Sequence, residues 1–550
     1  MSGLRFLLRE RGEERLKFNA LDCPYSSIRY PAYAKLGMVA TSNSLAAGAG
    51  MEMLKKGGNA IDAAIAAASC LTVCEPTSNG IGGDAFALVA AKGGLYGLNA
   101  SGPAPRGLSI SKLKKQGYQK IPRFGFVPVT VPGAPAGWAA MSERFGKLPL
   151  EQVLAPAIRY AREGFPLSVI LGQNWKRAFT VYQKQLKGEE YRPWFETFAP
   201  QGRAPRIGEM ITFPHHAKTL ELIAETKAEA FYRGEIAGQI DAFSRKYGGY
   251  IRREDLESYQ AEWVQPISVP YGEYEVWEIP PNGQGIVALM ALNILGGFEF
   301  PEQKSLSVYH RQIEAIKLAF EDAQRYVTDA AKMKIKVEDL LSSAWAEEKR
   351  KRIGSTALLP LPSQEQEGGT VYLAAADSEG NMVSFIQSNY MGFGSGLVVP
   401  QTGIALHNRG HNFSFDPLHH NALEPGKKSY HTIIPGFLTK GGKPLGPFGV
   451  MGGFMQPQGH VQVVTNLVDF KHNPQAALDA PRWQWKKGRE VDLEKTMPSQ
   501  IVRGLKEMGH KITVTEDNTG YGRGQIILRD EKGVLAGGSE TRVDGAILTW

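Results

Sequence analysis

Apolar positions recur at helical spacing through residues 44–327 and give way to short, strand-like runs after residue 370. The helical spacing predicts helices at 44–56, 60–73, 150–162, 217–225, 236–246, 286–295 and 308–327. The strand-like runs after residue 370 lie at 371–376, 382–387, 403–407 and 433–439, with a turn at 377–381, and one earlier strand is predicted at 86–90. A helix-rich part followed by a strand-rich part, without regular alternation of the two, predicts the α+β class.

One compositional break interrupts this pattern, at residues 354–369. The stretch is rich in Pro, Gly, Ser and Gln, which is typical of a loop, and it ends in Gly368-Gly369 directly before Thr370. If the bond between Gly369 and Thr370 breaks, Thr370 carries both a hydroxyl nucleophile and a free α-amine as its base. Taken alone, Gly-Gly-Thr before a strand is most often only the end of a loop.

Other motifs follow one another in a specific order. They occupy residues 58–64 (Gly-Asn-Ala-Ile-Asp-Ala-Ala), 75–84 (Glu-Pro-Thr-Ser-Asn-Gly-Ile-Gly-Gly-Asp), 131–138, 231–234, 248–256, 280–281 and 377–381. With these motifs and the Gly-Gly-Thr junction, the chain resembles the γ-glutamyltransferase family of N-terminal nucleophile (Ntn) hydrolases, from about Gly37 to the C-terminus.

The resemblance implies an architecture and a processing event. The expected fold is a four-layer αββα sandwich with the nucleophile on an inner strand. Residues 1–36 would form an N-terminal extension, 37–369 a large α-rich segment and 370–550 a small β-rich segment. The two segments would stay associated after self-cleavage between Gly369 and Thr370, and the enzyme could form a homodimer.

The resemblance also assigns catalytic roles by position. Thr370 would attack an amide carbonyl, and its α-amine would act as the base. Gly452 and Gly453 match a family glycine pair that places a backbone N–H at the oxyanion. Ser388 matches a hydroxyl position near the nucleophile. Paired glycines in a turn and a plain strand serine are the alternative interpretations.

The substrate-binding positions depart from the family pattern. His431 and Thr432 fall where two serines usually hold the donor's carboxylate. Ser101 falls where an arginine usually binds the α-carboxylate of a γ-glutamyl group, and Asn412 where an aspartate takes the α-amine. Arg409, Lys427 or Lys428 could replace the lost arginine.

Three functions are therefore compared. The first is a self-processing amidohydrolase or acyltransferase that transfers or hydrolyses a γ-glutamyl-like acyl group of a small-molecule donor, with water or an amine as acceptor. The second is a β-lactam side-chain acylase that cuts glutaryl- or adipyl-like amides, whose acyl groups carry no α-amine. The third is a non-enzymatic relative that keeps the fold as a binding protein.

Composition, charge and motif context argue against several other classes of protein. With 43% hydrophobic and 21% charged residues, the chain of 550 residues is typical of a globular protein. The net charge of +8 is spread along the chain, and we interpret the basic run 349–352 as a solvated helix end, so no nucleic-acid partner is predicted. Residues 80–85 spell G-x-G-x-x-A, but they follow a predicted helix and lead into a strand, unlike a dinucleotide loop.

Cysteine and histidine usage predicts neither a disulfide framework nor a metal or other cofactor. Besides Cys23, the chain has Cys70 and Cys74 in an apolar helical stretch, where they are predicted core residues. His407 and His411 have the spacing of a helical zinc pair, but a glycine and no carboxylate lies between them. The charged N-terminus and the lack of a run of about 20 apolar residues predict no membrane partner and a cytoplasmic location.

Overall fold

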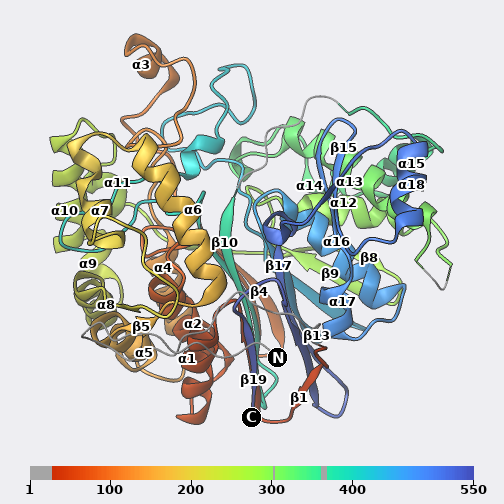
Figure 1. Cartoon of the computed structure of the whole chain (residues 1–550), viewed down its shortest axis with the longest axis horizontal. Helices are drawn as coiled ribbons and strands as arrows, with labels where there is room; N and C mark the ends of the chain where they lie inside the picture. Colours follow the sequence, from red (N-terminus) through yellow and green to blue (C-terminus); the bar gives the residue numbers. More distant parts are fainter. Residues whose placement is uncertain (1–27, 302–303, 361–367) are drawn as a thin grey trace, which may run out of the picture.

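The computed structural model describes residues 28–301, 304–360 and 368–550. Two seven-stranded sheets lie face to face at its centre (Figure 1). The first sheet has the order β1 (Ala32–Ala34), β18 (Leu535–Ser539), β17 (Arg523–Arg529), β13 (Lys443–Met451), β12 (Gly436–Lys440), β9 (Tyr274–Glu278), β8 (Ile267–Tyr271). The second has the order β19 (Ala546–Thr549), β2 (Gly37–Thr41), β10 (Gly369–Asp377), β11 (Met382–Tyr390), β3 (Asp84–Ala91), β4 (Gly94–Ala100), β7 (Glu262–Val264).

Helices cover the outer face of each sheet, which gives the predicted αββα sandwich (Figure 1). The second sheet is covered by α1 (Ser44–Lys55), α2 (Ala60–Cys74) and α4 (Ala134–Phe145), with α5 (Leu150–Glu163) and α8 (Pro214–Thr226) packed outside them. The first sheet is covered by α12 (Gly285–Leu295), α16 (Met455–Val468) and α17 (Pro474–Asp479), with α13 (Leu306–Tyr326) packed on them.

Smaller elements complete the described chain. The remaining helices are α3 (Ile110–Lys115), α6 (Val169–Gln185), α7 (Arg192–Phe198), α9 (Glu229–Tyr232), α10 (Glu235–Lys246), α11 (Arg253–Glu257), α14 (Val337–Leu340), α15 (Ser343–Lys351) and α18 (Ser499–Glu507). The remaining strands are β5 (Phe165–Pro166), β6 (Met210–Ile211), β14 (Trp483–Lys487), β15 (Glu490–Glu494) and β16 (Lys511–Thr515).

Helix α2 shows how composition fixes the layers. All 15 of its residues are buried, because it lies between α1, α5 and the second sheet. Small side chains such as alanine allow this close packing on all sides. Asn59 caps its first turn, and the Asp62 side chain accepts from the Asn59 backbone N–H. Cys70 and Cys74 lie in this helix as buried thiols, as predicted, whereas Cys23 lies outside the described residues.

Most predicted elements are present, and two predicted strands need correction. Residues 403–407 are not a strand, because only Ala405 and Leu406 form isolated bridges there. The strand predicted at 433–439 begins later, at Gly436. Residues 80–85 do follow a helix and lead into β3, as predicted.

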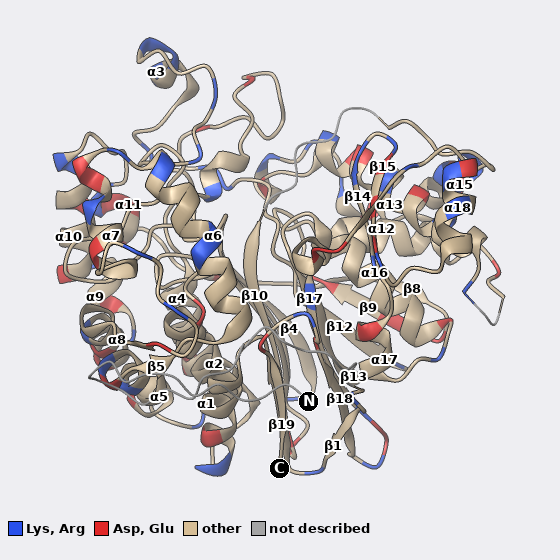
Figure 2. Ribbon diagram, in the orientation of Figure 1, with Lys and Arg blue, Asp and Glu red and all other residues tan. Residues whose placement is uncertain are grey.

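The basic residues are distributed as expected, with one exception. Figure 2 shows Lys and Arg interspersed with Asp and Glu over the outer helices. In the run 349–352, however, Lys349 is largely buried and lies 2.7 Å from Asp322 Oδ2, and Arg350 donates to two carbonyl oxygens of α12. The prediction of a wholly solvated run was therefore wrong. No helix among the described residues is long and apolar enough to cross a membrane.

The turn between β10 and β11 is bonded to helix α2 through Asp377. Its Oδ2 accepts from Ala60 N at 2.9 Å, and its Oδ1 accepts from the backbone N–H groups of Glu379 and Asn381. We expect Asp377→Ala to lower the free energy of unfolding by about 1.5–3 kcal/mol, the range for one hydrogen bond to a charged group. Urea unfolding measures this loss.

Two variants serve as controls for this prediction. Asp377→Asn keeps one acceptor oxygen and should lose less. Glu379→Ala removes an exposed carboxylate and should change the free energy by no more than about 0.5 kcal/mol. Equal losses in Asp377→Ala and Glu379→Ala would contradict the bridging role of Asp377.

Candidate active site

Thr370 lies near the start of β10, a central strand paired with β2 and β11. Gly369 pairs with Tyr390 and Val371 with Gln387, so Thr370 alone faces two residues of β11, Ser388 and Asn389. This irregularity is a β-bulge, and such bulges redirect side chains next to active sites. It turns the Ser388 hydroxyl towards the start of β10.

Hydrogen bonds connect the Thr370 hydroxyl to the carbonyl group of the preceding residue. Thr370 Oγ1 donates to Ser388 Oγ at 3.2 Å, and Ser388 Oγ donates to the Gly369 carbonyl oxygen at 2.7 Å. Ser388 Oγ is held in place by the Tyr390 backbone N–H, which donates to it at 2.8 Å. A hydroxyl and a polarised peptide carbonyl therefore lie together, with Thr370 and Ser388 buried and Gly369 half-buried.

The predicted glycine pair forms the turn between β13 and α16. Gly452 and Gly453 have φ angles of 136° and 60°, which disfavour a side chain. Gln284 Nε2 donates to the Gly453 carbonyl oxygen at 2.9 Å and fixes the turn. A Cβ placed on Gly368 would lie 2.7 Å from Gly453 Cα. In the uncleaved chain, Gly368 thus lies directly against this turn.

Arg409 is a cation in direct contact with the Ser388 hydroxyl. It is 1% exposed, and its Nη1 donates to Thr432 Oγ1 at 2.7 Å while its Nη2 donates to Ser388 Oγ at 3.5 Å. Its guanidinium carbon lies 4.2 Å from the centre of the Tyr390 ring. Its Nε has no hydrogen-bond partner among the described residues.

Asp84, the first residue of β3, has a buried carboxylate that lies beside Arg409. Asp84 Oδ2 is 3.9 Å from Arg409 Nε, 2.9 Å from His431 Nε2 and 3.4 Å from His407 Nδ1. Burial raises the pKa of Asp84 to about 7, although the Arg409 charge opposes this shift. Burial lowers the pKa of Arg409 to about 10 and that of His407 to about 3. Asp84 is therefore the group of this set that titrates near neutral pH.

Ser101 and Asn412, which replace the family's charged residues, are bonded to protein groups. Ser101 Oγ donates to Asn99 Oδ1 at 2.7 Å and accepts from Asn282. Asn412 Nδ2 donates to the Tyr430 carbonyl oxygen at 2.7 Å, and its Oδ1 accepts from the Tyr390 hydroxyl. Neither residue restores the missing charge.

Two of the three predicted replacement cations are engaged elsewhere. Lys427 Nζ donates to two carbonyl oxygens and to Glu424 Oε1. Lys428 Nζ lies 2.8 Å from Glu262 Oε2. Arg409 is the candidate of the three that contacts both Ser388 and Thr432.

His407 and His411, the pair with the spacing of a zinc site, are bonded to backbone carbonyl groups. His407 Nε2 lies 2.9 Å from the Thr130 carbonyl oxygen and His411 Nδ1 lies 2.9 Å from that of Ile121. Among the described residues, His310, Glu314 and His510 have ligand atoms close enough to hold a metal ion. The Lys317 ammonium lies 2.7 Å from Glu314 Oε1 and would repel a second cation there, so we assign no metal to this cluster.

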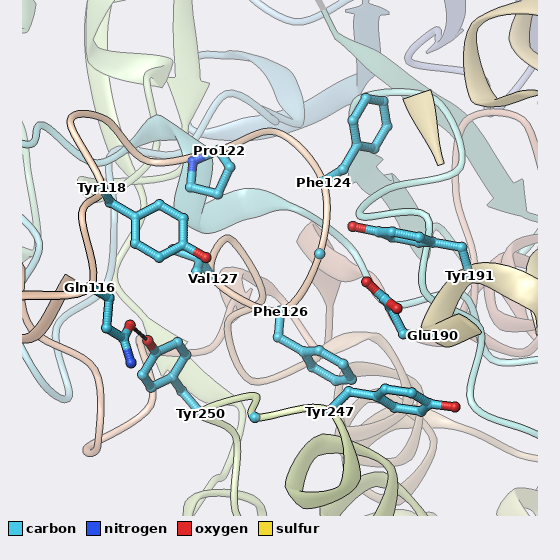
Figure 3. A pocket seen from close by; sticks show the side chains of 12 residues that line it. Gln116, Tyr118, Pro122, Phe124, Phe126, Val127, Glu190, Tyr191, Tyr247 and Tyr250 are labelled. Atoms are coloured by element: carbon cyan, nitrogen blue, oxygen red, sulfur yellow. Dashed lines mark hydrogen bonds between the residues drawn. The ribbon is translucent and has the colours of Figure 1, made fainter. Parts of the chain in front are cut away.

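A pocket of about 400 Å³ lies in the large segment and includes none of the predicted site residues. Figure 3 shows Tyr118 and Tyr250 on one side and Phe124, Tyr191 and Glu190 on the other. Thr370, by contrast, is 1% exposed in the uncleaved chain, so the candidate active site is closed before processing.

Three residues of the site were missed by sequence reasoning. Asp84 ends the Gly-Ile-Gly-Gly-Asp motif, and that motif was the available signal. Gln456 donates from Nε2 to Thr370 Oγ1 at 3.4 Å and Gln284 fixes the glycine turn. Nothing in the local pattern around either glutamine indicated these roles.

The fold and this site define the class of protein. Two facing antiparallel sheets between helical layers, with a threonine hydroxyl beside the carbonyl before it on a central strand, are typical of the Ntn hydrolases. The chain belongs to the gamma-glutamyltranspeptidase family, whose model matches residues 46–550.

Known proteins of similar sequence and structure agree with this assignment. The glutathione hydrolase-like YwrD proenzyme of Bacillus subtilis (strain 168) is 37% identical over 518 residues, covering 92% of this chain and 97% of the relative. The oxamate amidohydrolase proenzyme of Klebsiella pneumoniae is 32% identical over 525 residues, covering 93% and 98% of the two chains. The crystal structure of cephalosporin acylase from Bacillus halodurans superposes with a TM-score of 0.95 at 59% identity, covering 97% of this chain and 99% of that chain.

The chain is therefore an enzyme, an amidohydrolase or acyltransferase of the gamma-glutamyltranspeptidase family. The non-enzymatic alternative is set aside, because the family and these relatives are named for hydrolase, transferase or acylase activity.

Proposed function

We propose that this enzyme cleaves itself between Gly369 and Thr370 and then uses Thr370 to hydrolyse or transfer an acyl group that ends in a carboxylate. The hydrogen bonds from Thr370 Oγ1 to Ser388 Oγ, and from Ser388 Oγ to the Gly369 carbonyl oxygen, carry the proposal. The segments would be 37–369 and 370–550. The names of the relatives as proenzymes support a processed precursor.

Self-cleavage begins with attack of Thr370 Oγ1 on the Gly369 carbonyl carbon. Ser388, which donates to that carbonyl oxygen, stabilises the developing negative charge. The peptide C–N bond then breaks, the Thr370 nitrogen takes up the proton that the hydroxyl lost, and an ester links Gly369 to Thr370 Oγ1. Water then hydrolyses the ester, which leaves a carboxylate on Gly369 and a free amine on Thr370.

In the processed enzyme, the same hydroxyl attacks the amide of the donor. The α-amine of Thr370, with a reference pKa of about 7.7 to 8.0, accepts the hydroxyl proton and passes it to the leaving amine. Departure of the residues before Thr370 exposes the turn at Gly452 and Gly453, whose backbone N–H groups would bind the oxyanion. Water or an acceptor amine then takes the acyl group from Thr370.

Arg409 is the proposed partner of the donor's carboxylate. It is buried, its Nε lacks a hydrogen-bond partner in the described part of the chain, and its Nη1 donates to Thr432, which matches a family carboxylate-binding position beside His431. A γ-glutamyl group also needs a partner for its α-amine, and Asn412 supplies no charge. A glutaryl-like group has the carboxylate but no α-amine, so it needs no such partner and fits this site better.

The β-lactam side-chain acylase is the second candidate. The similarity to a cephalosporin acylase structure at 59% identity, together with the uncharged Asn412, supports it. A homodimer and a cytoplasmic location stay predictions.

Thr370→Ala should abolish self-cleavage, because it removes the attacking hydroxyl. Ser388→Ala should slow cleavage by about 10²–10³-fold, the usual effect of removing one oxyanion donor. A denaturing gel over time measures both, with pieces of residues 1–369 and 370–550 expected from the unaltered chain. An unaltered chain that stays whole at its active pH would refute self-processing.

A pair of glycine variants separates local strain from a general effect. Gly368→Ala places a Cβ 2.7 Å from Gly453 Cα and should slow cleavage at least about tenfold, which corresponds to about 1.4 kcal/mol of strain. Gly354→Ala lies in the same stretch, its new Cβ has no atom of the described residues within 4 Å, and this variant should cleave normally. Equal self-cleavage rates in the two variants would show that contact between Gly368 and the glycine turn does not affect cleavage.

Donor specificity should follow the carboxylate and not the amine. Glutaryl-p-nitroanilide differs from its γ-glutamyl counterpart only by the α-amine, and butyryl-p-nitroanilide lacks the carboxylate as well. We expect kcat/KM for glutaryl to equal or exceed that for γ-glutamyl and to exceed that for butyryl about tenfold or more, since a hydrogen bond to a charge contributes about 1.5–3 kcal/mol. A hundredfold preference for γ-glutamyl would show that the family's amine contact has been rebuilt.

A further inference from the structure

The bonding of His407 fixes where its ring hydrogen lies. Its Nε2 is 2.9 Å from the Thr130 carbonyl oxygen and 3.3 Å from the Thr130 hydroxyl oxygen. The nearer carbonyl oxygen can only accept, so Nε2 carries the hydrogen and the hydroxyl oxygen is a second, longer acceptor. In a neutral imidazole, Nδ1 then presents a lone pair. Nδ1 has no hydrogen-bond partner among the described residues, and it faces Asp84 Oδ2 at 3.4 Å.

His431 cannot relieve this contact, because its hydrogen is already used. The Ile433 backbone N–H donates to His431 Nδ1 at 3.3 Å, so Nε2 carries the hydrogen and donates to Asp84 Oδ2 at 2.9 Å. Between Asp84 Oδ2 and His407 Nδ1, two lone pairs therefore meet in a dry interior. One added proton would turn this repulsion into a hydrogen bond.

Whether Asp84 holds that proton decides which anion compensates the charge of Arg409. An ionised Asp84, 3.9 Å from Arg409 Nε, offsets the guanidinium charge. A bound carboxylate would then place two anions beside one buried cation, which is unfavourable. With Asp84 protonated, the bound carboxylate is the single counter-charge of Arg409.

We propose that Asp84 and His407 are specificity-determining residues, an inference that rests on the proposed function. They hold one proton between them when a carboxylate-bearing acyl group binds Arg409. The enzyme thus takes up an anion and a proton together. Asp84 and His407 act through Arg409 and are positioning residues for the donor.

The surroundings of Asp84 support a shared proton near neutral pH. Burial raises the pKa of Asp84 to about 7, against the charge of Arg409. The titratable and charged groups that face Asp84 come from all the elements around it: His407, Arg409, Lys428, His431, Tyr232 and Tyr259. Lys428 is already paired with Glu262, and both tyrosines have pKa values well above their usual range, so neither titrates between pH 6 and 9.

The raised pKa of Asp84 determines how anion binding changes with pH. Below about pH 7, Asp84 already holds the proton, and an anion binds without further uptake. Above that pH, each bound anion draws up to one proton from solution, so its dissociation constant should rise up to about tenfold per pH unit. A donor without a carboxylate should show no such rise.

Calorimetry of glutarate binding to the processed enzyme tests this directly. Titrations at pH 8.5 in two buffers of different ionisation enthalpy give the number of protons taken up. Asp84→Asn is a matched variant, because its amide can accept from His431 and donate to His407 Nδ1 as a protonated Asp84 would. We expect at least half a proton more uptake in the unaltered enzyme. Uptake by the Thr370 amine would occur in both proteins and cancels in the difference.

Kinetics give a second measurement that needs no variant. For butyryl-p-nitroanilide, kcat/KM should rise with pH through the Thr370 amine and then level off. For glutaryl-p-nitroanilide, it should rise and then fall, because KM increases as Asp84 ionises. Identical pH profiles for the two donors, equal proton uptake in both proteins, or no glutarate binding would overturn the inference while leaving amide cleavage intact. Failure to cleave either anilide would instead refute the proposed function.

Discussion

The pairing of β10 with its two neighbours is the constraint on which the site depends. Leu373 pairs with Thr41 of β2 and with Phe385 of β11, so the strand is fixed from both sides. Because side chains alternate between faces, a slip of one residue would turn Thr370 to the opposite face of the sheet. The bulge in β11 adds one residue opposite Thr370 and so brings Ser388 against both the hydroxyl and the Gly369 carbonyl.

Sequence reasoning reached the fold class, the long helices and the residues around the nucleophile, because each left a local signal. The apolar period marked α2, and the Gly-Gly-Thr junction marked the start of β10. Residues 403–407 had strand composition but found no long partner, since pairing is decided by tertiary context. Gln284 and Gln456 act over long sequence separations, for which periodicity carries no information.

The substitutions at the substrate-binding positions are connected to one another only in the three-dimensional structure. In the sequence, His431 and Asn412 read as separate losses of family contacts. In the structure, His431 and Arg409 both approach one carboxylate, Asp84, which sequence reasoning had passed over. Arginine, histidine and aspartate in a dry interior have to be matched to one another, because an unpaired buried charge costs several kcal/mol. Losing Arg409 alone would leave the Asp84 carboxylate without its cation.

Each sheet contains strands from both sides of the Gly369–Thr370 bond: β9 adjoins β12 in one, and β2 and β3 flank β10 and β11 in the other. A cut at that bond therefore leaves the fold intact but changes how it could be regained. Refolding would become a second-order encounter between two incomplete chains, each with open sheet edges prone to aggregation. The lifetime of the mature enzyme would then be set by how slowly it unfolds, and no longer by the balance between folded and unfolded chains.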